Sequence, residues 1–288
     1  MSKQLPLRQR VRKGLILTMF LLFPLILYYF SPALIIEGAA LGIVTGSFIM
    51  FGLMFVSSLF VGRLWCGWAC PGAGLQEMFA GVNNQPVRSR WAGRVKWIIW
   101  TPWILGIAAA ALSAGGLHQV DPFFRTVGGV SVAEPASYIV YYGVVAIFVV
   151  LALTVGRRGG CHVICWMAPF MILGRQIRNR FGWASLQLTA DADRCVDCTR
   201  CSTNCPMSLD VHKMVQTSNM EHPDCVLCGT CVDNCKKGVI RFNFAPVRRT
   251  ADQTQRQVNH PVLAYEQRMI LKPRRYEGKG ETRCGSRF

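Results

Sequence analysis

Eight of the thirteen cysteines fall into two nearly identical runs, and this repeat constrains the chain more than any other feature. Each run has the spacing C-x2-C-x2-C-x3-C, so three thiols lie in one tight loop and the fourth is displaced by a turn. Three thiols of a run can therefore share one site while the fourth reaches another. The runs consist of Cys195, Cys198, Cys201 and Cys205, and of Cys225, Cys228, Cys231 and Cys235.

This spacing predicts two [4Fe–4S] clusters that exchange their fourth ligands. Pro206 follows the first run as expected, whereas Lys236 stands where a second proline should be. Zinc sites usually divide their cysteines into distant pairs, and disulfides need an oxidising compartment, so both alternatives are weaker. The expected ligands are Cys195, Cys198, Cys201 and Cys235 for the first cluster, and Cys225, Cys228, Cys231 and Cys205 for the second.

The composition predicts a membrane protein. Hydrophobic residues make up 51% of the chain, yet its formal net charge is +17. These values are compatible because the apolar runs precede residue 160 and basic residues flank them. No basic stripe interleaved with aromatic residues marks a nucleic-acid-binding module, so we expect no nucleic-acid partner. Four membrane-spanning helices are expected, at residues 14–30, 35–61, 97–114 and 137–155.

The charges of the loops predict the orientation in the membrane. Five basic residues lie in the segment 63–96, and two more follow the fourth span, whereas the loop 115–136 has only Arg125. Basic loops stay on the cytoplasmic side of a membrane. We therefore expect a multi-pass protein of the cytoplasmic (inner) membrane, with both termini and the cysteine runs in the cytoplasm, where thiols remain reduced.

A second cysteine motif, C-x3-C, occurs after the second expected span and again after the fourth. The pairs are Cys66 with Cys70 and Cys161 with Cys165. This recurrence predicts an internal duplication of a membrane hairpin that ends in a cysteine pair. Four thiolates brought together can hold a third iron–sulfur cluster or another soft metal, and each pair can instead act as a redox dithiol. His162 is a further candidate ligand.

The expected fold is an α-helical integral membrane domain followed by a small α+β domain of the bacterial 2[4Fe–4S] ferredoxin type. In the small domain, we expect a helix at 211–216 and a closing strand at 239–244, with cluster ligation replacing much of the apolar core. Cys284 in the tail is expected to be a free thiol. The expected divisions are a basic N-terminus (1–13), a four-helix domain (14–160), a cysteine pair with an amphipathic membrane-surface segment (161–188), a ferredoxin-like domain (189–245) and a basic, disordered or lipid-binding tail (246–288).

Over about residues 10–245 the chain resembles the membrane-bound ferredoxin-type subunits of periplasmic nitrate reductase systems, which are quinol dehydrogenase subunits. It is also similar to the iron–sulfur half of the related nitrous-oxide-reductase maturation proteins. Cys66-Gly-Trp-Ala-Cys70-Pro71 fits the first C-x3-C-P motif of this family. The second motif keeps the cysteine spacing but has Trp166 in place of the proline, with Pro169 displaced.

The resemblance implies electron exchange between the quinone pool, as diffusible substrate, and a redox partner protein. That partner would be a periplasmic or membrane reductase subunit or a cytoplasmic donor. Four polar residues near the outer interface are candidates to contact the quinone: Glu37, His118, Asp121 and Arg125. Two other hypotheses are a copper or disulfide reductase that acts through the C-x3-C cysteines, and a redox-sensing assembly factor without turnover.

Overall fold

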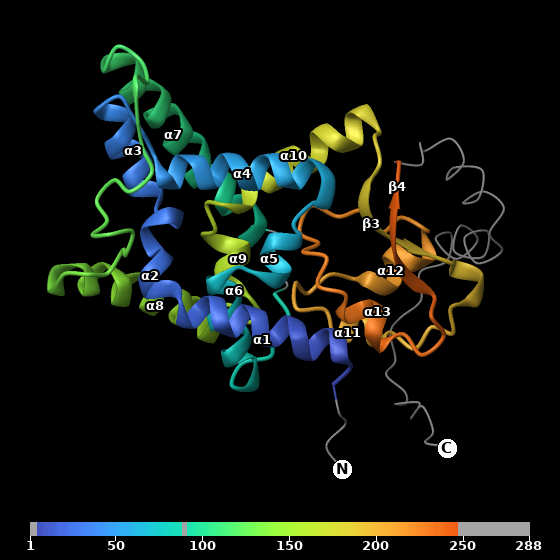
Figure 1. Cartoon of the computed structure of the whole chain (residues 1–288). Coiled ribbons are helices and arrows are strands. Elements are labelled where there is room, and N and C mark those ends of the chain that lie inside the picture. The colour runs from blue at the N-terminus through green and yellow to red at the C-terminus, as the bar shows by residue number, and fades with distance from the viewer. Residues whose placement is uncertain (1–4, 88–90, 247–288) are drawn as a thin grey trace.

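The computed structural model describes residues 5–87 and 91–246 of the chain (Figure 1). The tail beyond residue 246, with Cys284, lies outside the described residues. The first half of the chain forms α1 (Leu7–Leu21), α2 (Phe23–Ile26), η1 (Leu27–Phe30), α3 (Pro32–Ala40), β1 (Ile43–Thr45), α4 (Gly46–Val61), α5 (Leu64–Trp68), α6 (Pro71–Met78) and η2 (Phe79–Gly81). The second half forms α7 (Ala92–Ser113), β2 (Gln119–Asp121), α8 (Pro135–Thr154), α9 (Gly159–Val163), α10 (Ala168–Phe181), β3 (Ser185–Ala190), η3 (Ala192–Arg194), α11 (Arg200–Thr203), α12 (Val211–Gln216), α13 (Thr230–Asn234) and β4 (Ile240–Ala245).

Among the described residues, two helices are long and apolar enough to cross a membrane: α7 from residue 93, and α8. They agree with the third and fourth expected spans. The first expected span falls on two segments, α1 and the stretch formed by α2 and η1, whose axes are bent by 61°. They form a third span only if the bent pair crosses the membrane as one. Exposed apolar side chains such as Leu105 of α7 and Ile139 of α8 give these helices a surface suited to lipid.

The prediction of one continuous span over residues 35–61 is wrong. α3 ends at Ala40, β1 follows, and the apolar helix α4 that begins at Gly46 has 16 residues. Gly42 adopts φ +70° and a Cβ there would meet the His118 ring at 2.1 Å, while a Cβ at Gly46 would lie 2.2 Å from the Pro122 carbonyl. These glycines admit the loop that carries β2, which pairs in parallel with β1.

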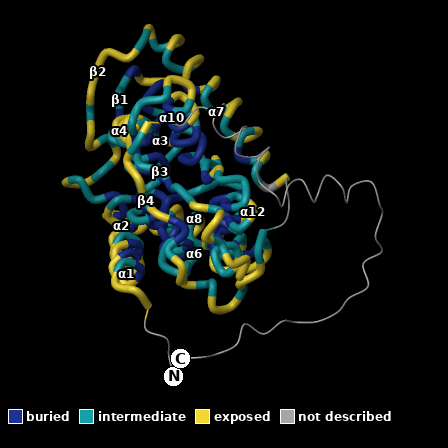
Figure 2. The backbone as a smooth tube through the Cα atoms, turned by 90° about the vertical axis from the view of Figure 1, so that its right-hand side faces the viewer, coloured by how far each residue is buried: buried dark blue, intermediate teal, exposed yellow. Residues whose placement is uncertain are grey.

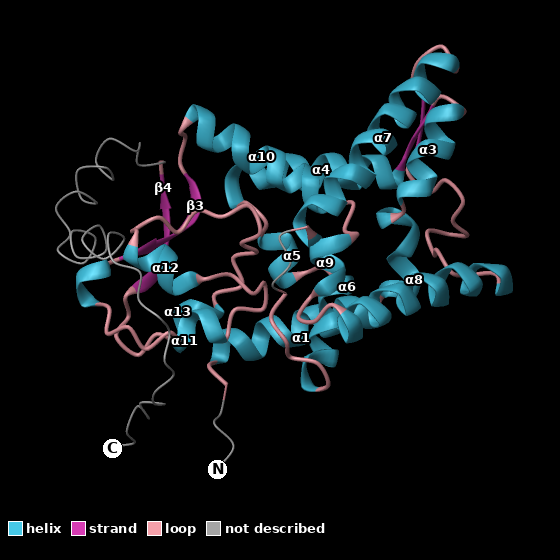
Figure 3. Ribbon diagram, turned by 180° about the vertical axis from the view of Figure 1, so that it is seen from behind, coloured by secondary structure: helices cyan, strands magenta, loops and turns pink. Residues whose placement is uncertain are grey.

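The helices from α1 to α10 form the membrane part of the molecule, and two layers of them enclose its centre. α4 and α10 lie along one side, α1 and α8 lie along the other, and the short helices α5, α6 and α9 fill the space between them (Figures 1 and 3). Buried residues gather between these layers, and exposed residues follow the loop that carries β2 (Figure 2). The centre of the molecule is thus built from the segments that carry the C-x3-C cysteines.

The segment expected to lie on the membrane surface packs on the protein. Its helix, α10, contacts α4 and buries Met171 and Ile172. The chain leaves the helix at Gly182, and the Trp183 indole donates to the Leu59 carbonyl at the end of α4 (3.0 Å). α4 therefore covers α10 at Met171 and Ile172, whereas Ile177 and Phe181 (70% exposed) farther along the helix are exposed, and the position of this segment on the membrane surface stays a prediction.

The small C-terminal domain lies at one end of the molecule, opposite α3 (Figure 1). β4 pairs antiparallel with β3, and Ile240 in β4 is buried with Val211 and Val215 of α12. The expected helix at 211–216 is confirmed, and the closing strand is shifted by one residue. The two main parts of the predicted fold, a helical apolar region and a C-terminal ferredoxin-type domain, are confirmed. The four spans and the duplicated hairpin are not.

Candidate functional site

The two C-x3-C motifs have the same local structure. In each, the first cysteine lies in a helix of five residues, Cys66 in α5 and Cys161 in α9. In each, a longer helix with a proline in its first turn then follows. α6 begins at Pro71, and α10 begins at Ala168 with Pro169 next. Proline suits this position because the first turn of a helix leaves its N–H groups unpaired. Pro169 thus takes the place of the proline that Trp166 replaces in the motif.

The structure brings the four C-x3-C cysteines together, and each is at most 6% exposed. Burial, together with the neighbouring Cys161 and Cys66 thiols, raises the pKa of Cys165 to about 12. Burial also raises the pKa of Cys70, with contributions from the same neighbours. Cys70, Cys161 and Cys165 line one cavity, and Cys66 is buried in the same cluster of side chains, so the two motifs form one buried four-cysteine site.

Besides Arg63, which donates from Nη2 to Cys66 Sγ at 3.9 Å, two side chains contact the sulfur atoms of this site. Gln76, in α6, donates from Nε2 to Cys161 Sγ at 3.2 Å and accepts from the Gly160 amide. Cys66 Sγ lies 3.9 Å from Met171 Sδ. Each contact joins the first motif to the second or to the helix that follows it, so the four-cysteine site holds the two halves of the membrane part together.

The ferredoxin cysteines form two groups of different exposure. Cys205, Cys225, Cys228 and Cys231 line one small cavity, so the last cysteine of the first run lies beside the second run, and burial with these neighbours raises the pKa of Cys231. That grouping is the one the exchanged-ligand assignment needs. In the first run Cys198 is exposed, and Cys195 and Cys201 are half-buried. The described contacts of Cys235 place its Sγ 3.4 Å from the Val239 amide and do not join it to the first run.

The four-cysteine site and the second cysteine run lie against each other. Gly67, between Cys66 and Cys70, approaches the Val226 carbonyl so closely that a Cβ would lie 2.3 Å from it. The Trp68 indole donates to the Leu227 carbonyl (3.1 Å), and Gln9 of α1 donates to the Cys228 carbonyl (3.1 Å). The two sites are therefore neighbours.

A buried ion network lies beside the contact between Gly67 and the second cysteine run. Glu77 of α6 accepts from Arg12 through two hydrogen bonds of 2.9 Å and from Arg158, which precedes α9. Burial alone would raise the pKa of Glu77, but Arg158 and Arg12 lower it to about 2. The two arginines also donate to the Gly67 and Cys66 carbonyls, so the charges fix the backbone of the first motif.

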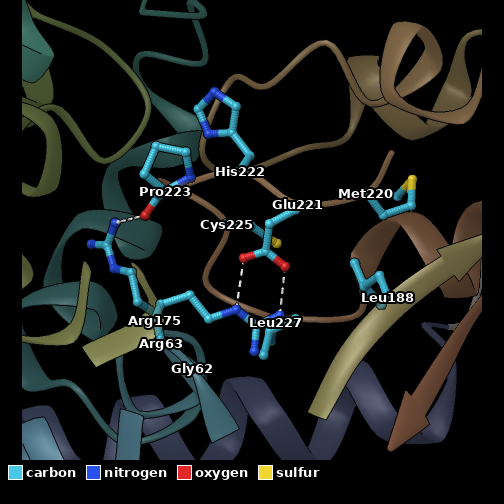
Figure 4. A pocket seen from close by; sticks show the side chains of 10 residues that line it. All are labelled: Gly62, Arg63, Arg175, Leu188, Met220, Glu221, His222, Pro223, Cys225 and Leu227. Atoms are coloured by element: carbon cyan, nitrogen blue, oxygen red, sulfur yellow. Dashed lines mark hydrogen bonds and ion pairs between the residues drawn. The ribbon is translucent and has the colours of Figure 1, made fainter. Parts of the chain in front are cut away.

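A second ion network ties the membrane helices to the ferredoxin domain. Asp224, just before the second run, accepts from Lys96 of α7 (2.5 Å) and Arg63 (3.2 Å). Burial would raise the pKa of Asp224, but Lys96 and Arg63 lower it to about 2. Arg175 of α10 holds Glu221 with two bonds of 2.6 Å, beside the Arg63 contact to the Pro223 carbonyl (Figure 4).

The residues around the four-cysteine site fit an anionic sulfur-rich group. Four thiolates are soft ligands, and the Arg63 cation lies beside them. Burial opposes the charge of Arg63, but Cys66 and Asp224 raise its pKa above the ordinary value. Three buried nitrogen atoms next to the cysteines have no hydrogen-bond partner among the described residues: Arg63 Nε, Trp65 Nε1 and His162 Nε2. Sulfur atoms of an iron–sulfur cluster are suitable acceptors for such donors.

Several of these residues were not identified from the sequence. Arg63 and Arg158 each stand three positions before the first cysteine of a pair, a repeated pattern that could have marked them. The loop charge pattern instead assigned them to the membrane surface. The outer polar candidates form no such site, because Glu37 pairs with Arg125 on an exposed surface, and His118 and Asp121 bond to neighbouring backbone.

Comparisons with known proteins support the iron–sulfur assignment. A 4Fe-4S binding domain matches residues 43–94, which include Cys66 and Cys70, and a 4Fe-4S dicluster domain matches residues 194–240, which include both cysteine runs. The chain therefore carries two iron–sulfur domains of the 4Fe-4S type, together with two helices that are long and apolar enough to cross a membrane.

Distant relatives support this class. YccM of Escherichia coli, named as an electron transport protein, is 22% identical over 70% of this chain and 56% of its own length. RdxA of Cereibacter sphaeroides is 25% identical over 67% of this chain and 44% of its own length. MJ0749 of Methanocaldococcus jannaschii, an uncharacterised protein, is 24% identical over 75% of this chain and 83% of its own length. The chain thus spans about half the length of YccM and RdxA. No solved structure matches the chain.

Proposed function

We propose that this protein exchanges electrons between the membrane quinone pool and a redox partner protein. Iron–sulfur clusters, when bound, supply one-electron donors and acceptors at its cysteines. Two [4Fe–4S] clusters would be held by the ferredoxin runs with the exchanged ligands Cys205 and Cys235, and a third by Cys66, Cys70, Cys161 and Cys165. The polypeptide holds these ligands, excludes water from the four-cysteine site and sets the distances between the sites.

One observation carries the proposal: the buried four-cysteine site lies between the apolar helices and the second ferredoxin run, with Gly67 against Val226. A site in that position can connect a membrane-soluble carrier with a ferredoxin domain. Arg12 and Arg158 share Glu77, and Arg63 and Lys96 share Asp224, so four cations at this contact face two carboxylates. The excess positive charge would offset the negative charge of thiolate-ligated clusters. The 4Fe-4S domain match over residues 43–94 supports a cluster, since Cys66 and Cys70 are its only cysteines.

The exposure of the cysteine runs suggests the side on which the partner binds. In the second run Cys228 and Cys231 are buried and no cysteine is exposed, whereas Cys198 of the first run is exposed. Val196, which follows Cys195, is 59% exposed, an apolar side chain beside a redox ligand. We infer that the redox partner approaches the first run, because this places its own centre nearest to a cluster.

The same end of the molecule carries α1's basic first turn, where Arg8 pairs with Asp233 (2.8 Å). The start of the N-terminal helix and the ferredoxin domain therefore lie on the same side of the molecule. With the basic loops, this supports a cytoplasmic location for that side, in the inner membrane.

The reductase hypothesis has two forms, a disulfide reductase and a copper reductase. Burial of the four-cysteine site keeps a protein disulfide from reaching Cys66 or Cys161, so a disulfide reductase is disfavoured. A soft metal is more compatible, because the Met171 thioether lies beside Cys66 and both are ligands that copper(I) favours. Copper that binds the purified protein, and is lost when Cys66 and Cys161 are replaced by Ser, would support that function.

The experiment uses anaerobically purified protein in lipid nanodiscs, with EPR of the ferredoxin clusters as the signal. A short-chain quinol should reduce them, or a quinone should oxidise them after dithionite reduction, depending on the direction of flow. The double variant Cys66→Ser with Cys161→Ser should lose the quinone reaction and keep the dithionite reaction, whereas Cys284→Ser should behave as wild type. If wild-type protein shows neither reaction, the proposal is wrong.

A further inference from the structure

An apolar cavity of about 210 Å³ lies directly against the four-cysteine site. Equivalent residues of the two C-x3-C motifs form one part of its wall. The first motif contributes Cys70, Pro71 and Gly72, and the second contributes Cys165, Trp166 and Met167. Trp166, which stands where the family motif has a proline, thus lines the cavity and ties it to η1 by donating to the Phe30 carbonyl (3.0 Å).

The other walls come from helices that face lipid. Leu27 and Phe30 of η1 and Val144 and Phe148 of α8 line the cavity. Two lining residues are exposed, Ala33 and Val140, and Val140 lies on a candidate span. These residues mark an opening toward the surrounding lipid, through which a molecule dissolved in the membrane can enter without crossing water.

The size and shape suit one flat ring. A cavity of about 150 Å³ in another protein holds benzene, so 210 Å³ accommodates a substituted six-membered ring while its tail remains in lipid. Phe148 and Trp166 lie 6.2 Å apart with planes at 71°, and aromatic walls of this kind pack well on a planar ring. Ser31 and Tyr28 are the hydroxyl residues in the wall. The Tyr28 hydroxyl donates to Ser137 Oγ (2.9 Å) and can still accept from a phenol, whereas Ser31 Oγ accepts from the Leu34 amide and keeps its own proton for a carbonyl.

We infer that this cavity binds the ring of a lipophilic quinone or quinol, beside Cys70, Cys161 and Cys165. The inference rests on the proposed function and identifies where in the structure the quinone would bind. The outer residues Glu37 and Arg125 do not line the cavity. A second apolar cavity of about 350 Å³, lined by Met19 and Leu53 among others, contains no cysteine and serves as the comparison site.

The test is photolabelling of the iron-loaded protein in nanodiscs of phosphatidylethanolamine and phosphatidylglycerol, with an azido-quinone as probe. Labelled peptides should come from η1, α8 and residues 165–167, and excess unlabelled quinone should abolish the labelling. Val144→Phe and Val140→Trp place bulk in the cavity or at its opening and should weaken binding about tenfold or more. Leu53→Phe makes a similar change at the second cavity and should leave binding unchanged.

Iron content and the ferredoxin EPR signal, unchanged in all three variants, show that each has folded. Labelling in the second cavity, or wild-type affinity in both filled variants, overturns the inference. The two proposals can fail separately. Quinol reduction of the clusters without labelling here refutes the cavity but leaves the function, whereas saturable labelling here without electron exchange refutes the function and leaves the cavity as a quinone site.

Discussion

Replacing Gly67 by alanine tests the contact between the four-cysteine site and the ferredoxin domain. The new Cβ would lie 2.3 Å from the Val226 carbonyl oxygen and 3.4 Å from Cys228 Cα and N. Both neighbours are backbone, so no side chain can rotate away. Because ordinary contacts begin near 3.4 Å, the two loops must separate by about 1 Å, and such overpacking costs about 1–3 kcal/mol.

The separation also strains the Trp68 bond to Leu227 and the Arg12 bond to the Gly67 carbonyl. We expect the ferredoxin clusters of Gly67→Ala to be reduced by dithionite at the wild-type rate but to exchange electrons with quinone more slowly. Stopped-flow absorbance measures both rates, and the midpoint of thermal loss of the cluster absorbance, which we expect to fall, measures the strain.

Gly52→Ala is the matched control, since a Cβ at Gly52 in α4 meets nothing within 4 Å. It should match the wild type in both rates and should not lower the thermal midpoint, because alanine is favoured over glycine inside a helix. If Gly67→Ala also matches the wild type in all three, the close approach of the two loops does not govern their coupling, and the reasoning is refuted.

Three further predictions concern α6. Glu77→Gln should lower the free energy of unfolding by about 3–5 kcal/mol, because Arg12 and Arg158, whose side chains are 3% and 1% exposed, lose their counter-ion. A thermal midpoint equal to that of Glu37→Gln, a change at an exposed position, would contradict this. The lowered pKa of Glu77, about 2 against an ordinary 4.5, means that its contribution is complete above pH 4.5 and is lost as pH falls toward 2. The stability difference between wild type and Glu77→Gln should therefore shrink across that range; a constant difference would argue against it. Gln76→Leu removes the hydrogen bond to Cys161 Sγ and should lower the reduction potential of the third cluster by about 40 mV, with the ferredoxin potentials unchanged in an EPR titration.

The features that could be predicted from the sequence are local. The spacing of each cysteine run is set within a few residues, so the two loops and the helix at 211–216 were identifiable from the chain alone. The second run gains its neighbour Cys205 from the first, a relation that the duplicated spacing already suggests. The recurrence of C-x3-C likewise indicated that the two motifs would meet.

The features that the sequence did not predict depend on distant residues. Glycines at 38, 42 and 46 suit close helix packing, but they also suit a turn that admits the loop carrying β2, and only the three-dimensional contact distinguishes the two. The basic residues Arg63 and Arg158 look like membrane-flanking charges until Asp224 and Glu77 are seen beside them. The cavity follows from the meeting of η1, α8 and both motifs, which no local pattern encodes.

The most direct test of the account is the amount of iron and acid-labile sulfide bound per chain. Anaerobically purified wild-type protein should hold about twelve irons, and the variant Cys66→Ser with Cys161→Ser about eight, because three [4Fe–4S] clusters become two. The eight that remain should keep the ferredoxin EPR signals. About eight irons in both proteins would contradict the account, because the four cysteines at the centre of the molecule would then hold no cluster.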